Sequence, residues 1–179
     1  MKGIVFTEFL ELVETKFGLE MVDKIINQSK LESQGAYTAV GTYQFSEMLQ
    51  LLQNLSKNTN ISTDDLLLVY AEHFFEVLKT NYSQLFIYYN NPIDLLSSIE
   101  NHIHVEVLKI YPDAELPTFE VLKKTKKKLI LLYTSSRAMH HFGLGLMNKT
   151  FEHFNTTATI VLEKLNDEGT EVKFIISQN

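Results

Sequence analysis

Apolar residues recur at spacings of three and four through the first two-thirds of the chain, which is the period of amphipathic helices. Gly18 is typical of a helix end, and Ser62 and Asn91-Pro92 are typical of helix starts. Residues 30–42 hold no strong period and are expected to connect two helices. The pattern predicts helices over 3–17, 19–29, 43–56, 62–78 and 92–111.

The pattern changes after Pro112, where apolar residues gather in short runs. These runs predict strands over 128–133, 157–164 and 171–177. A helix is predicted over 137–154, and residues 166–169 (NDEG) are typical of a hairpin between the last two strands. We therefore expect an α+β fold, in which an N-terminal helical layer packs over a C-terminal part with an antiparallel sheet and an inserted helix.

The composition narrows the classes of protein that fit this sequence. Its 179 residues, with no long linker, are expected to form one domain. The absence of cysteine excludes a disulfide scaffold, thiol catalysis, an iron–sulfur cluster and a cysteine-ligated zinc. A net charge of −6 argues against a generic nucleic-acid binder. No stretch reaches the roughly 18 apolar residues of a membrane span, and no secretory signal opens the chain, so a cytoplasmic protein is expected.

Five lysines lie within residues 123–128 (KKTKKK), next to a predicted strand. Such a run between two strands usually forms the solvated tip of a hairpin, and a patch for an anion or a partner is the less frequent alternative. We therefore expect a hairpin tip at this position.

Two of the six histidines, His102 and His104, lie on the predicted helix over 92–111. At about 100° per residue, His104 falls on a flank continuous with Leu108 and Tyr111, beside the apolar stripe. His102 falls on the opposite flank, so His104 is the more inward of the two. A histidine in this position is usually a satisfied core residue, but a neutral imidazole on a rigid helix can also bind haem iron.

Tyr133, Ser135 and Arg137 alternate along a segment that reads as the end of a strand. Alternation in an extended chain sends all three side chains to one side. Two hydroxyls and one guanidinium can satisfy two carboxylates. The alternative is that Ser135 or Ser136 is only the N-cap of the following helix.

Taken together, these motifs resemble the H-NOX family, the haem nitric oxide/oxygen-binding domains. The Tyr133-x-Ser135-x-Arg137 pattern is similar to the propionate-binding motif of the family. The segment from His104 to Pro112, followed by Leu116-Pro117, resembles its proximal histidine helix and the loop after it. The opening Met1-Lys2-Gly3 is also typical, and the resemblance runs from Met1 to the last strand.

The resemblance implies a haem b held between a helical subdomain of about residues 1–60 and a mixed α/β subdomain of about residues 61–179. It implies His104 as the metal ligand, and Tyr133, Ser135 and Arg137 as the partners of the haem propionates. It also places Pro117 against the porphyrin and Val5 among the cofactor-binding residues. Ala71 departs from the family pattern, which usually has a glycine at this position.

The distal residues implied by the resemblance indicate the gas ligand. Oxygen-binding members carry a tyrosine nine residues after the first tyrosine of the propionate motif, and here that position is Phe142. The positions of the supporting polar residues match Phe9 and Phe74. O₂ bound to ferrous haem carries partial negative charge and is stabilised by a hydrogen bond, whereas nitric oxide needs much less such help. A pocket without a hydrogen-bond donor therefore favours nitric oxide over O₂. Tyr70, His73, His140 and His141 are neighbouring groups that a modest helix rotation could bring to the iron.

The expected function is a gas sensor rather than an enzyme. NO, and also CO, would bind the ferrous iron, weaken its bond to His104 and change the conformation of the helix. The family implies a separate partner, a histidine kinase or a diguanylate cyclase. The net charge and the lack of an apolar span lead us to expect neither a nucleic-acid nor a membrane partner. One alternative is a haem enzyme, a peroxidase or NO dioxygenase, with His141 as its distal acid or base. Another is an interaction module without haem.

Overall fold

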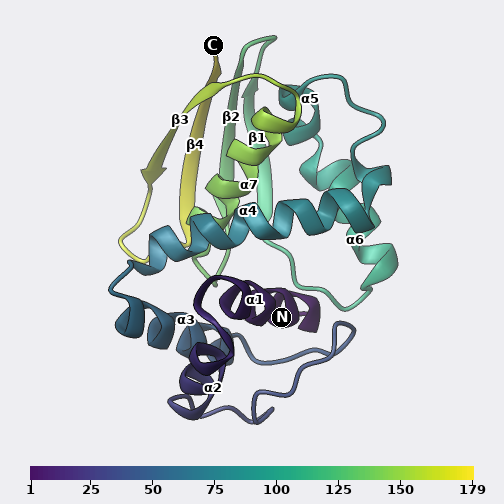
Figure 1. Ribbon diagram of the computed structural model, residues 1–179. Helices are drawn as coiled ribbons and strands as arrows, with labels where there is room; N and C mark the ends of the chain where they lie inside the picture. Colours follow the sequence, from purple (N-terminus) through teal and green to yellow (C-terminus); the bar gives the residue numbers. More distant parts are fainter.

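The structure is a computed structural model that describes residues 1–179, and it confirms the α+β fold (Figure 1). Its helices are α1 (Gly3–Phe17), α2 (Leu19–Asn27), α3 (Phe45–Thr59), α4 (Thr63–Asn81), α5 (Pro92–Ser97), α6 (His104–Ile110) and α7 (His140–His153), with short helical turns η1 (Ser83–Leu85) and η2 (Ile99–Ile103). Its strands are β1 (Thr118–Lys124), β2 (Lys128–Thr134), β3 (Ala158–Lys164) and β4 (Glu171–Gln178). None of the helices combines the length and the apolar character that crossing a membrane requires.

Three predicted helix boundaries are set by capping residues. Gly18 separates α1 from α2 with a φ of 84°, and its N–H donates to Glu14 O over 2.8 Å. Ser62 Oγ accepts from the N–H of Asp65 at the start of α4, over 3.1 Å. The side chain of Asn91 caps α5 in the same way, and Pro92 fills the first turn of that helix. These predictions are confirmed.

The prediction of one continuous helix over 92–111 is wrong, because the winding changes within this segment. Helix α5 ends at Ser97, and η2 follows as a π-helical turn in which the N–H of Ile103 donates to Ser98 O over 3.3 Å. A π turn holds more residues than an α turn, so it rotates everything after it about the helix axis. His104 is the first residue after this turn, at the start of α6.

The four strands form one antiparallel sheet in the order β1-β2-β4-β3. The register places Leu131 of β2 opposite Phe174 of β4, and both side chains are fully buried. Alternate residues of the two central strands face the interior, which fixes their pairing. The turn between β1 and β2 carries the lysine run, and residues 123–127 are exposed, so the predicted hairpin tip is confirmed.

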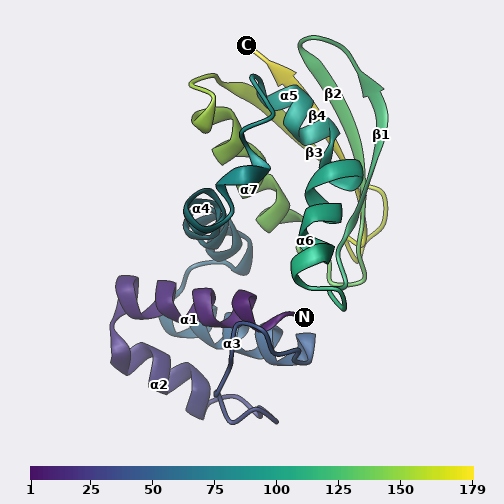
Figure 2. The ribbon, with the colours of Figure 1, turned by 90° about the vertical axis from the view of Figure 1, so that its right-hand side faces the viewer.

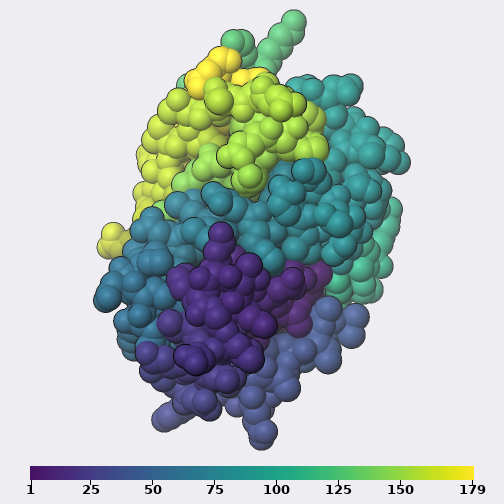
Figure 3. All heavy atoms as spheres, in the orientation of Figure 1, coloured from purple at the N-terminus to yellow at the C-terminus, as the bar shows by residue number.

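The molecule has two hydrophobic cores. One lies among α1, α2, α3 and the first part of α4, and it includes Phe6, Leu51 and Tyr70. The other lies between the sheet and helices α5 and α7, and it includes Leu131 and Phe174. Helix α4 crosses between the N-terminal helices and the sheet half, packing against both α1 and α7 (Figure 2). In the space-filling view its residues form a band between the N-terminal and C-terminal parts (Figure 3).

Candidate functional site

A cavity of about 300 Å³ lies between the two halves of the fold, and 24 of the 32 residues that line it are hydrophobic. Helices α1, α4 and α7 contribute to it, as do α6 and the segment that follows α6. In Figure 2, α6 lies beside β1, with α4 across from it. The cavity is therefore an apolar slot that few polar groups enter.

His104 lines this cavity, and only 13% of its side chain is exposed. Its Nδ1 lies 3.0 Å from Glu100 Oε1, which also accepts the N–H of Phe119 over 2.7 Å. Because Nδ1–H donates to Glu100, Nε2 is the nitrogen with the free lone pair. Burial lowers the pKa of His104 from its usual 6.5, and the Glu100 carboxylate acts in the opposite direction. The fold thus favours a neutral imidazole.

His102 has a different environment, as the sequence predicted. Its Nδ1 shares a hydrogen bond of 2.7 Å with the hydroxyl of Tyr89, and it does not line the cavity. The ordering of the two histidines is confirmed. Glu100, by contrast, was not predicted, although its spacing of four residues from His104 is a signal that sequence reasoning can use.

The structure brings Tyr133, Ser135 and Arg137 to the same cavity. Tyr133 lies near the end of β2, and Ser135 follows that strand. The Ser135 hydroxyl accepts from the N–H of Arg137 over 3.2 Å, while α7 begins later, after Met139, without a side-chain cap. The alternative of a serine N-cap for the predicted helix is therefore wrong.

Arg137 shows that a carboxylate can reach its guanidinium at the mouth of the cavity. Its Nη1 donates to the backbone oxygen of Glu115 over 2.7 Å, and its Nη2 donates to the carboxylate of the same residue. The Glu115 side chain is 83% exposed, whereas that of Arg137 is 15% exposed. The guanidinium is therefore held in place from the solvent side, next to an apolar slot.

The wall formed by α1, α4 and α7 is almost without polar side chains. Val5, Phe74 and Phe142 line it, and Pro117 lines the cavity from the segment after α6. The family resemblance implied these four residues as cofactor-binding. The remaining lining residues from these three helices are Ile4, Phe75, Leu78, Gly143, Leu146, Met147 and Thr150. The one hydroxyl among them, on Thr150, donates to the backbone oxygen of Leu146 over 2.8 Å.

Phe9 is buried, but it does not line the cavity. It packs edge-on against Tyr70, with ring centroids 5.4 Å apart. Tyr70 in turn lies 5.0 Å from the ring of Phe142. Phe9 therefore lies behind the wall and supports it through Tyr70.

The four neighbouring polar groups on α4 and α7 are engaged elsewhere, and none of them lines the cavity. Tyr70 donates to Val5 O over 2.6 Å, and His73 lies 3.1 Å from Glu8. Nδ1 of His140 donates to Gly169 O over 3.1 Å, and Nδ1 of His141 lies 3.2 Å from Asp64 Oδ1. Each of these residues therefore has a partner within the fold and does not reach the cavity surface.

The comparisons with known proteins identify the class. A model of the haem-NO-binding family matches residues 2–162. The unliganded Fe(II) H-NOX protein of K. algicida is 72% identical, with coverage of 100% of this chain and 97% of that one and a TM-score of 0.98. The A71G variant of that protein matches at 71% identity with the same coverage and TM-score.

Two further solved structures show the range of the family. The H-NOX of Shewanella woodyi, bound to IWP-051 in its Fe(II)CO state, is 35% identical, with coverage of 100% and 95% and a TM-score of 0.84. An H-NOX protein of S. oneidensis in the Fe(II)NO state is 21% identical, with coverage of 100% and 99% and a TM-score of 0.91, and this likeness concerns the fold. The chain belongs to the H-NOX family of haem-based gas sensors.

The residues of the cavity fit a haem. An apolar slot suits the porphyrin, and a neutral imidazole with a free Nε2 suits the iron. Arg137 already pairs with one carboxylate at the mouth, so its position suits a propionate.

Proposed function

We propose that this protein binds haem b and senses nitric oxide, with CO as a second ligand and O₂ excluded. In this proposal His104 is the metal ligand, and Tyr133, Ser135 and Arg137 hold the propionates. Val5, Phe74, Phe142 and Pro117 form the walls of the slot, and Phe9 supports them from behind. When bound, the haem supplies a ferrous iron that coordinates a diatomic gas.

The selectivity for NO is carried by one observation, the absence of a free hydrogen-bond donor on the wall formed by α1, α4 and α7. Dioxygen on ferrous haem gains negative charge and needs a donor for stability, whereas nitric oxide needs much less help. The one hydroxyl on this wall, on Thr150, is committed to the backbone. Relatives in the Fe(II)NO and Fe(II)CO states support NO and CO as ligands, while the exclusion of O₂ rests on the wall alone.

We further propose that release of His104 carries the signal. His104 begins α6, so loss of its bond frees the start of this helix from the cavity. Val105 and Leu108 of α6 are exposed, do not line the cavity and move with the helix. A separate partner, a histidine kinase or a diguanylate cyclase of the cytoplasm, reads the change if it binds the two conformations with different affinity.

The same geometry favours a sensor over a haem enzyme. A peroxidase or an NO dioxygenase uses a polar distal group for acid–base chemistry. His141 was the candidate for that role, but it pairs with Asp64 and does not line the cavity. Steady turnover of peroxide or NO that is lost in a His141→Ala variant would restore the enzyme interpretation.

The testing experiment is an absorption spectrum of the haem-loaded protein, reduced without oxygen and then exposed to air or to NO. We expect no stable change in air and an immediate shift with NO. Replacing Phe142 by Tyr places a donor on the wall, so the oxygen affinity should rise by about tenfold, the effect of one net hydrogen bond. A stable oxy spectrum of the unaltered protein would refute the proposed selectivity.

The haem assignment has its own test in His104→Gly. This variant should lose normal ligation, and added imidazole should restore the spectrum because it refills the ligand position. Spectra that match those of the unaltered protein would rule out His104 as the ligand. A colourless protein after reconstitution with haem would leave the interaction module as the function.

A further inference from the structure

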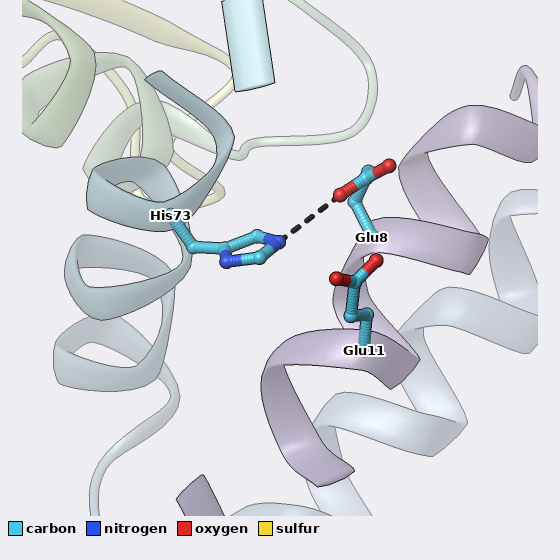
Figure 4. A group of neighbouring side chains, drawn as sticks. All are labelled: Glu8, Glu11 and His73. Atoms are coloured by element: carbon cyan, nitrogen blue, oxygen red, sulfur yellow. Dashed lines mark hydrogen bonds and ion pairs between the residues drawn. The ribbon is translucent and has the colours of Figure 1, made fainter. Parts of the chain in front are cut away.

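Three potential metal ligands meet between α1 and α4, outside the cavity (Figure 4). Glu8 and Glu11 lie one turn apart on α1, and His73 points toward them from α4. One ligand atom from each residue lies within 4.8 Å of the other two, and His73 Nε2 is 3.1 Å from Glu8 Oε2. None of the three residues lines the haem cavity.

The charge of this cluster is not balanced by the protein. The only ion pair that either carboxylate makes is the contact of Glu8 with His73. Glu11 makes no side-chain hydrogen bond or ion pair. Glu8 and His73 are only 17% and 23% exposed, so solvent screens their charges incompletely. Two carboxylates one helical turn apart repel each other, and a bound cation would turn this repulsion into attraction.

The ligand set indicates which cation fits. Two carboxylates and one imidazole are hard and borderline donors, and zinc accepts both kinds. Calcium and magnesium prefer oxygen ligands alone, so the histidine disfavours them. Zinc bonds of about 2.1 Å in a tetrahedral site place ligand atoms roughly 3.4 Å apart. The spacing of the Glu8 and His73 atoms is close to this value, and Glu11 is exposed and free to adjust.

We propose that Glu8, Glu11 and His73 form a zinc site that cross-links α1 to α4, with water as the remaining ligand. The site is independent of the haem and of the gas that binds there. Zinc would join an N-terminal helix to the helix that carries Phe74 on the cavity wall. Its presence should therefore raise the thermal stability of the haem-loaded protein.

The test is a zinc titration of haem-loaded protein without an affinity tag, in competition with a chromophoric chelator. We expect one zinc per chain and a higher unfolding temperature with zinc. Loss of a residue that hydrogen-bonds a metal ligand weakens metal binding by about 10- to 100-fold. Loss of a ligand itself, in His73→Gln or Glu11→Gln, should therefore weaken zinc binding by at least tenfold. In difference spectra against the same haem-loaded protein without added metal, cobalt should give the visible absorption bands of a low-coordinate site, and these should vanish in both variants.

The matched control is Glu20→Gln, which removes the same charge from an exposed position on α2 and should leave the affinity unchanged. Glu11 has no side-chain partner in the fold, so Glu11→Gln keeps the test decisive if His73→Gln is unstable. Equal zinc affinity in the unaltered protein and Glu11→Gln would overturn the proposal, because the zinc would then occupy other histidines. Failure to bind one equivalent of zinc would overturn it as well.

Discussion

Glu100 is the residue that fixes the chemistry of His104. Its carboxylate bonds Nδ1 of the imidazole and also accepts the N–H of Phe119 on β1. One acidic side chain therefore ties the candidate ligand to the edge of the sheet. A carboxylate partner raises the basicity of a metal-ligating histidine and orients its ring.

Glu100→Gln should weaken this effect while keeping the bond to Phe119. The amide oxygen still accepts a hydrogen bond, but the negative charge is lost. We expect the haem affinity to fall by about tenfold, the lower end of the range for such partners. The iron–histidine stretching frequency should also fall, which resonance Raman spectroscopy measures. Glu106→Gln on α6, whose carboxylate pairs with Lys109, is the control, and equal frequencies in the two variants would contradict the role of Glu100.

Periodicity identified His104 rather than His102 as the more inward histidine. The two residues lie on different flanks of the helix whether it is wound as an α-helix or contains a π turn. Glu100 was missed although its spacing of four residues from His104 was a usable signal, and in the structure it lies within the π turn that precedes His104. The family resemblance, not periodicity, placed Val5, Phe9, Phe74 and Phe142 at the cofactor. Three of them line the cavity, whereas Phe9 lies behind its wall. A phenylalanine at a wall and one in the core have the same pattern, and only packing separates them.

At the scale of the elements, capping residues allowed helix boundaries to be predicted from the sequence. Strands could be predicted from alternating apolar residues only where one face of the strand is buried. The helix over 3–17 and its stop at Gly18 match the structure, since a capping residue acts on its own turn. Strand β1 gave no such signal, because Phe119 is its one buried residue. Helix α7 begins at His140 rather than at 137, because Ala138 adopts a positive φ of 49° that ends the preceding turn.

Helices α4 and α7 approach each other so closely that Gly145 has no room for a side chain. A Cβ at this position would lie 2.5 Å from the Cβ of Ala71 and 3.1 Å from Leu68 O. We expect Gly145→Ala to destabilise the protein by about 1–3 kcal/mol, because the helices must move apart. Denaturation by urea of the haem-loaded protein measures this change.

The control is the same substitution combined with Ala71→Gly, a change that the K. algicida fold accepts at a TM-score of 0.98. Removing the Ala71 methyl group relieves the closest contact, although Leu68 O remains. The cost of Gly145→Ala should therefore be smaller in the Ala71→Gly background, by at least about 0.5 kcal/mol. Equal costs in both backgrounds would show that the two helices do not meet at this pair.

The whole molecule is two packed halves with a slot between them, and a few polar contacts close its edge. Lys2, just before α1, donates to Asp113 Oδ1 over 3.0 Å, and Thr42 donates to Asp113 Oδ2 over 2.7 Å. Asp113 lies in the segment after α6, so these bonds join the N-terminal half to the segment that follows His104. Movement of α6 would strain these bonds, so the proposed release of His104 would be felt in the opposite half through them.

A second histidine makes the stability of the whole fold depend on pH. His140 is buried at the start of α7, where Nδ1 donates to Gly169 O and Nε2 has no partner. Burial lowers its pKa from 6.5, and the charges of His141 and Lys164 lower it further. The opposing effects of Gly169 O and Asp64 are smaller. The folded state therefore holds the neutral ring, and the unfolded state takes up a proton at a higher pH.

The contribution of His140 to the free energy of unfolding should be fully present above pH 6.5. It should fall as the pH drops below that value, because protons then bind the unfolded chain preferentially. One such group contributes a slope of at most about 1.4 kcal/mol per pH unit. His140→Gln cannot titrate, yet its amide can still donate to Gly169 O, so its free energy of unfolding should fall less between pH 7 and pH 5. Urea denaturation at several pH values measures both proteins. Parallel profiles would show that the acid sensitivity arises elsewhere, whereas a flatter profile for the variant would assign it to the contact between α7 and the β3–β4 turn.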